Sequence, residues 1–153
     1  MATISLGRGE SSGEASAPRY LLDTNICIYI AKHNPPEVRE RFARFVASDL
    51  AMSVITLGEL RFCAEKSQQR ERALAAIQAL SDLIPPTPLP EAAAEHYGQI
   101  RAALQASGQV IGGNDLWIAA HARAEGWVLV TNNEREFVRV PGLQVENWVR
   151  PLV

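Results

Sequence analysis

Residues 20–25, with the sequence YLLDTN, join a short apolar run directly to a polar turn. An apolar run that stops at turn-forming side chains is typical of a buried strand. Residues 127–130, WVLV, repeat this pattern and are followed at once by residues 131–133, TNN. The two segments therefore predict two strands of one buried sheet, each with polar side chains at its carboxyl end.

The rest of the chain predicts helices between short strands. Apolar residues at helical spacing, together with proline and glycine at segment ends, set the expected bounds. Further strands are expected at residues 50–54, 83–84 and 145–148, and helices at residues 26–31, 37–47, 56–66, 69–83, 91–107 and 114–124. Alternating strands and helices favour an α/β fold with a mostly parallel sheet, in which ligands bind at the carboxyl ends of the strands.

Length and composition indicate one globular domain. The chain has 153 residues, of which 47% are apolar and 21% charged, with a net charge of -2, so it is not a basic nucleic-acid binder as a whole. No apolar run approaches the ~18 residues of a membrane helix. Its two cysteines, Cys27 and Cys63, form no CxxC, which favours a reducing, cytoplasmic location and predicts two buried thiols.

The first 18 residues differ from the rest in composition. They are rich in glycine, serine, alanine and glutamate and have no apolar signal-peptide core. We interpret residues 1–18 as a disordered leader, a cloning remnant or an extension from an upstream start site. The folded domain is expected to span residues 19–153.

Asp23 is the first candidate catalytic acid, because it follows the first strand at the sheet's carboxyl edge. It is equally suited to cap the next helix. Glu59 is the second candidate, although Thr56-x-x-Glu59 also matches a capping box. The apolar neighbours Leu57 and Leu60 suggest that this helix start faces inward, so that Glu59 points into a cleft.

Asp115 is the third candidate and follows a double-glycine turn. Acids are also favoured in the first turn of any helix by the helix dipole. The helix that follows is almost wholly apolar, which places it in the core and favours His121 as a core or groove histidine rather than a catalyst. Beyond the last long strand, Glu134 and Glu136 add two carboxylates; a solvated turn suits Glu134 better than Glu136, which stands beside Phe137.

Together these acids fall on what should be one edge of one sheet. Carboxylates gathered there repel one another unless a cation compensates their charge. Oxygen ligands without a histidine or cysteine cluster favour Mg²⁺ or Mn²⁺. A bound metal lowers the pKa of water and stabilises charge on a phosphate, so the pattern indicates phosphodiester hydrolysis.

Three stretches carry a resemblance to a known family: LLDTNICIYI, SVITLGELRFCAEKS and IGGNDLWIAAHARAEGWVLVTNNEREFVRVPGLQVENW. In order and spacing they resemble the PIN-domain toxins of the VapC group, from about Arg19 to Trp148. The resemblance implies a three-layer α/β/α PIN domain and an endoribonuclease that depends on Mg²⁺ or Mn²⁺. It also implies the toxin of a toxin–antitoxin pair, a homodimer held by a cognate antitoxin, which attacks structured RNA such as tRNA.

The resemblance also assigns roles by position. Asp23, Glu59 and Asp115 match the family's first three acids, with Asp23 and Asp115 as metal ligands. Many PIN domains carry an aspartate where Asn133 stands here, so Glu136 is expected to supply the fourth acid. The expected supporting residues are Thr24, Asn25, Thr131, Asn132 and Asn133. Apart from the resemblance, and from their position in the chain alone, Arg135, Arg139 and the basic face of Arg39, Arg41 and Arg44 are expected to contact RNA phosphates.

Two other functions remain open from the sequence. The chain could be a non-catalytic PIN-like module that dimerises and binds an antitoxin or operator DNA, with the acids serving as caps. It could also be a phosphotransferase with Asp23 as nucleophile, although the DTN segment lacks the second aspartate of a DxD motif.

Overall fold

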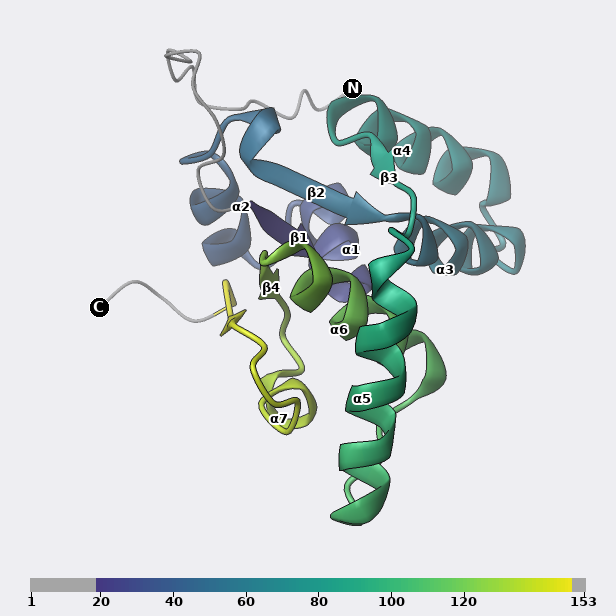
Figure 1. Ribbon diagram of the computed structural model, residues 1–153. Coiled ribbons are helices and arrows are strands. Elements are labelled where there is room, and N and C mark those ends of the chain that lie inside the picture. Colours follow the sequence, from purple (N-terminus) through teal and green to yellow (C-terminus); the bar gives the residue numbers. More distant parts are fainter. Residues whose placement is uncertain (1–18, 150–153) are drawn as a thin grey trace.

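The computed structural model describes residues 19–149, so the expected leader lies outside the described residues. A five-stranded sheet, in which every pair of neighbouring strands is parallel, has the order β3-β2-β1-β4-β5 (Figure 1). The strands are β1 (Tyr20–Leu22), β2 (Leu50–Ser53), β3 (Pro86–Thr87), β4 (Val128–Val130) and β5 (Val145–Glu146). Leu22, the last residue of β1, lies opposite Met52 and Val130. The segments that follow β1 and β4 therefore leave the sheet side by side.

Helices cover both faces of this sheet. They are α1 (Thr24–Lys32), α2 (Pro36–Phe42), α3 (Val54–Glu65), α4 (Arg70–Leu83), α5 (Ala92–Ala106), α6 (Gly113–Glu125) and α7 (Glu134–Phe137), with a 3₁₀ turn, η1, at Ala47–Asp49. Successive strand residues point to opposite faces, so Leu22 joins a core with α1 to α4 while Leu21 joins a second core with α5 to α7. The predicted α/β/α three-layer fold is confirmed.

Several predicted elements have different bounds in the structure; the last strand, expected over residues 145–148, is only Val145–Glu146, and two others differ more. Residues 83–84 are not a strand, because α4 continues through Leu83 and the edge strand is Pro86–Thr87. Proline lacks a donor N–H, which an edge strand tolerates. The helix expected over residues 37–47 ends at Phe42, and the chain then turns so that Phe45 stacks on the buried Trp148 with ring centroids 5.0 Å apart.

Other side-chain predictions can also be compared with the structure. Residues 134–137 form the short helix α7, where the sequence indicated a turn. Cys27 is buried as expected, but the prediction for Cys63 was wrong, because this side chain is exposed on α3. His121 is fully buried and its Nδ1 lies 3.1 Å from Ser53 Oγ, which confirms a core histidine. Within residues 19–149 no helix is long and apolar enough to cross a membrane.

Candidate active site

Asp23 is both a helix cap and a buried acid at the sheet edge. Its Oδ1 accepts a hydrogen bond of 3.0 Å from the N–H of Ile26 and so caps α1. Its Oδ2 accepts a hydrogen bond from the hydroxyl of Thr131, which follows β4. The side chain is only 5% exposed. The two interpretations of Asp23 are therefore compatible, because one oxygen caps the helix and the other faces the end of the neighbouring strand.

Glu59 is not part of a capping box, so that interpretation of Thr56 and Glu59 was wrong. The helix starts earlier than expected, at Val54, and is capped by Ser53, whose Oγ accepts from the N–H of Ile55 at 3.2 Å. Glu59 therefore lies in the second turn of α3. Its Oε1 accepts a 2.7 Å hydrogen bond from the hydroxyl of Thr24, at the start of α1. This bond directs the carboxylate toward the end of β1.

Asp115 lies in the first turn of α6 and is half-buried. The helix begins at Gly113 after Gly112, so neither Asn114 nor Asp115 is the cap. The pKa of Asp115 is raised to about 6, first by burial and then by the negative charges of Glu59, Glu136 and Asp23. The four predicted acids therefore lie close enough together for the charges of the other three to affect the pKa of Asp115.

Burial likewise raises the pKa of Asp23 to about 6, and the charge of Glu59 adds to the shift. Hydrogen bonds from Thr131 and from the backbone N–H groups of Ile26 and Asn25 oppose it. Burial wins because a carboxylate removed from water loses more than these bonds return. In the absence of a cation, the ionised form of Asp23 is therefore disfavoured at this position.

The segment after β4 supplies a second set of contacts. The N–H of Asn133 donates to Thr131 Oγ1 at 2.9 Å, and its side-chain amide donates to Glu136 Oε2 at 2.8 Å. A chain of bonds thus joins Asp23, Thr131, Asn133 and Glu136. Asn132 lies apart from it, since it is exposed and donates to the hydroxyl of Tyr29 at 3.2 Å.

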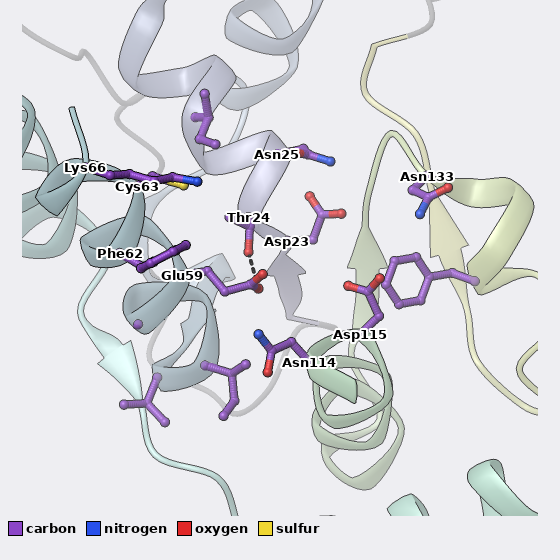
Figure 2. Close-up of a pocket in the computed structure, with 15 residues that line it drawn as sticks. Asp23, Thr24, Asn25, Glu59, Phe62, Cys63, Lys66, Asn114, Asp115 and Asn133 are labelled. Atoms are coloured by element: carbon purple, nitrogen blue, oxygen red, sulfur yellow. Dashed lines mark hydrogen bonds between the residues drawn. The ribbon is translucent and has the colours of Figure 1, made fainter. Parts of the chain in front are cut away.

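A cavity of about 760 Å³ opens above these acids (Figure 2). Its lining consists of Asp23, Thr24, Asn25, Ile28, Val54, Ile55, Gly58, Glu59, Phe62, Cys63, Lys66, Asn114, Asp115, Asn133 and Phe137. Glu136 is not in the lining and reaches the site through Asn133. Phe62, Cys63 and Lys66 did not emerge as site residues from the sequence, although they follow Glu59 at helical spacing.

The predicted RNA-binding arginines lie outside the cavity. Arg135 is exposed on α7 and Arg139 is half-exposed just after it. Arg41, of the expected basic face, donates to Glu146 in an ion pair of 2.8 Å, while Arg39 and Arg44 are exposed. Among these three, only Arg39 and Arg44 remain open to a phosphate.

The donor set is suited to a hard divalent cation. The cavity is lined by three carboxylates and the amide groups of Asn25, Asn114 and Asn133. Within residues 19–149 no three acidic, histidine or cysteine side chains form a ready-made metal cage. Mg²⁺ does not need one, because it takes one or two carboxylates and keeps several waters. Burial and neighbouring carboxylates raise the pKa of Asp23 and Asp115, and a bound cation would favour their ionised forms again.

The buried acid predicts a pH effect on the metal-free protein. The pKa of the Asp23 carboxyl is near 3.8 in the unfolded chain and about 6 in the folded protein, so folding favours its protonated form. The contribution of Asp23 to the free energy of unfolding is therefore greatest below about pH 3.8 and is lost as the pH rises through about 6. Asp23→Asn removes this titration. We expect the variant to gain stability over wild type as pH rises from about 4 to 7, by up to about 3 kcal/mol.

Urea unfolding in EDTA across that range measures the difference. Asp49→Asn, a change of the same chemistry at the 3₁₀ turn, is the matched control. A wild-type to Asp23→Asn difference that stays constant with pH would contradict the prediction.

This fold and this site together define a class. A parallel α/β/α domain gathers acids from three segments at the carboxyl edge of its sheet, and the profile of the PIN domain family matches residues 20–143. The chain therefore belongs to the PIN-domain family.

The relatives are more specific. The chain is 48% identical to "tRNA(fMet)-specific endonuclease VapC" of Shigella flexneri over 85% of this chain and 98% of that protein. It is 46% identical to "Ribonuclease VapC2" of Haemophilus influenzae over 86% and 98%. Within the PIN-domain family it thus groups with the VapC toxins, as the sequence predicted.

Solved structures give the same result. The chain superimposes with a TM-score of 0.81 and 43% identity on a chain of DNA-bound VapBC from Salmonella typhimurium, covering 86% of this chain and 99% of that one. VapBC-1 from nontypeable Haemophilus influenzae matches with a TM-score of 0.78 and 40% identity, covering 86% and 98%. Both structures are complexes of VapC with VapB.

Proposed function

We propose that this protein is a metal-dependent endoribonuclease toxin that cleaves structured RNA, with tRNA as the first candidate substrate. The observation that carries the proposal is the convergence of Asp23, Glu59 and Asp115 on one cavity, with Glu136 held behind it by Asn133. Burial, together with the charges of Glu59, Glu136 and Asp23, raises the pKa of Asp115 to about 6. The ribonuclease relatives, and the tRNA named for the Shigella flexneri protein, support the substrate class.

Asp23 and Asp115 would ligate Mg²⁺ or Mn²⁺, because they line the cavity from the segment just after β1 and from the first turn of α6, and a cation would stabilise the ionised form of both. A divalent ion there supplies a water of lowered pKa and stabilises charge on the phosphate. Glu59, held by Thr24, would orient a water or a second ion. Thr131 fixes Asp23, and Asn133 fixes Glu136. Asn25 would contribute an amide oxygen at the rim.

Restraint by a partner is part of the proposal. VapC structures similar to this chain were solved as complexes with VapB, one of them bound to DNA. We propose a cognate antitoxin for this chain, whose arginine or lysine would occupy the acid-lined cavity, and a homodimeric toxin. Operator DNA would then be bound by the complex, which leaves the nuclease site of the free toxin intact. A cytoplasmic location remains a prediction.

Metal removal tests the proposal directly. Purified protein incubated with total RNA and with tRNA should give discrete cuts in Mg²⁺ or Mn²⁺ and none in EDTA. Added Mg²⁺ should restore the cuts, because the donors are oxygens. Sequencing of the product ends maps each cut. Absence of cleavage by folded protein, with metal and a broad RNA pool present, would favour the non-catalytic binding module.

Arg135 and Arg139 are proposed to hold phosphates beside the site. Arg135→Ala should weaken RNA binding at low salt. It should also make the fall of the logarithm of the binding constant with the logarithm of salt concentration less steep by about 1, because one phosphate contact is lost. Salt-dependent binding of RNA to wild type and variant measures this. Arg72→Ala, an exposed arginine on α4, is the control. Equal slopes for wild type and Arg135→Ala would remove Arg135 from the RNA-binding surface.

A further inference from the structure

One side of the cavity has a character unlike its acidic floor. Phe62 is 64% exposed although it is a large apolar side chain. The Nζ of Lys66 lies 4.6 Å from the centre of the Phe62 ring. Both residues line the cavity on α3, the helix that also carries Glu59, and Figure 2 shows them on the opposite side of the cavity from Asn133. An aromatic ring and a cation thus stand together at the rim of the proposed active site.

We propose that Phe62 and Lys66 form a nucleotide-binding subsite, in which the ring stacks on an unpaired base of the RNA and the ammonium group contacts a backbone phosphate. This inference rests on the proposed ribonuclease function. Stacking on an aromatic side chain is the usual way in which proteins hold unpaired bases, and each base has a face suited to it.

The spacing along α3 places the subsite beside the reacting phosphate. Phe62 and Lys66 follow Glu59 by three and seven residues, which is ~4.5 Å and ~10 Å along the helix axis. These offsets keep all three side chains near one face of the helix. A strand of RNA with a phosphate at the acids would therefore pass along α3 and bring a neighbouring nucleotide to the Phe62 ring.

Charge favours an anionic ligand at this rim. Lys66 is the one cationic side chain in the described lining of the cavity, and it lies at the end away from Asp115 (Figure 2). A phosphate is attracted there, whereas the floor repels it until a metal ion binds. An arginine or lysine of a protein partner, which suits the acids, would be repelled by Lys66. We therefore assign the rim to RNA.

Binding of a short single-stranded RNA that spans the mapped cut tests the subsite. Every variant carries Asp23→Asn, so that the RNA stays intact in Mg²⁺. Phe62→Ala should weaken binding about 5- to 150-fold, and Phe62→Trp should restore it. Lys66→Gln should make the decrease of RNA affinity with salt concentration less steep, by about 1 on a log–log plot. Val110→Ala and Lys32→Gln, both exposed and outside the cavity lining, are the matched controls and should bind like the parent.

A scan of abasic nucleotides identifies the contact. At one position next to the cut, loss of the base should weaken binding to the parent and have no effect on Phe62→Ala, because the stacking partner is already gone. When Asp23 is left intact, Phe62→Ala should raise the KM for RNA cleavage relative to wild type, with little change in kcat.

Cys63 provides an independent reporter within the subsite. It is exposed between Phe62 and Lys66, whereas the other thiol in the sequence, Cys27, is fully buried and has a raised pKa because of that burial. Iodoacetamide should therefore modify Cys63 selectively, and bound RNA should slow the reaction. Phe62→Ala should reduce this protection at equal RNA concentration.

Three results would overturn the subsite. They are abasic effects of equal size in the parent and in Phe62→Ala, unchanged Cys63 alkylation at saturating RNA, and a Phe62→Ala variant that binds RNA normally but loses a dimer in sedimentation or affinity for its antitoxin. Metal-dependent cleavage by the wild type is scored separately, so failure of the subsite is distinct from failure of the nuclease.

Discussion

Asp23→Asn is expected to lower kcat/KM for RNA cleavage about a thousandfold, since metal-assisted charge stabilisation contributes several kcal/mol to such reactions. Asp23 is the most deeply buried of the acids, with 5% exposure, and is held from two sides by Ile26 and Thr131. The amide has the same shape but no negative charge, so a metal ion would lose its central anionic ligand.

The same variant should remain folded. Asparagine caps helices as well as aspartate does, and its side-chain oxygen can still accept the bond from Ile26. Its melting temperature in EDTA at neutral pH should be equal to that of the wild type or above it. Asp49→Asn, outside the cavity lining, should cleave RNA at the wild-type rate. If Asp23→Asn kept a tenth of the activity, Asp23 would not be a required metal ligand.

Trp148→Ala is expected to lower the free energy of unfolding by about 3–5 kcal/mol, the usual loss for a fully buried aromatic side chain. Trp148 is 0% exposed and stacks on Phe45 with an interplanar angle of 4°. Its indole N–H donates to Glu146 Oε1 at 3.1 Å, and Arg41 donates to the same oxygen at 2.8 Å. The variant would therefore lose core packing, a stacked pair and a donor to Glu146 together.

Urea unfolding followed by circular dichroism measures the loss, and Trp148→Phe should recover part of it. Trp117→Ala is the matched control, because Trp117 is half-exposed and stacks on Tyr97 near the surface of α5 and α6. A loss below about 1 kcal/mol for Trp148→Ala, within the range of a surface substitution, would show that the C-terminal segment contributes little to the core.

Much of the fold could be predicted because its local signals agree. The apolar segments near residues 21, 51 and 129 are strands, and Gly108 and Gly126, at φ of 70°, close α5 and α6 as glycine does at helix ends. Segment ends were less predictable. The bounds of α2 and β3 depend on where Phe45 and Trp148 meet and on which strand lies at the edge of the sheet.

The candidate site shows the same division. Its acids could be chosen from the sequence because strand ends and helix starts of a parallel sheet meet at one edge. The bond from Thr24 to Glu59 spans 35 residues, and no local pattern contains it. The capping-box interpretation of Glu59 was wrong because the choice of Ser53 as cap depends on where β2 ends. Phe62 and Lys66 matched helical spacing, but their exposure at the cavity depends on the packing of α3.

The sequence by itself determined the α/β class, with a parallel sheet and helices on both faces, and the candidate acids Asp23, Glu59 and Asp115, because these follow from local periodicity and turn chemistry; the choice of Glu136 came from the family resemblance. Only the tertiary structure decided which acids meet, which oxygen each hydrogen bond occupies, and that Asp23 and Asp115 have raised pKa values. Those properties depend on burial and on the distances between charges from distant segments, and both exist only once the two layers of helices have closed over the sheet.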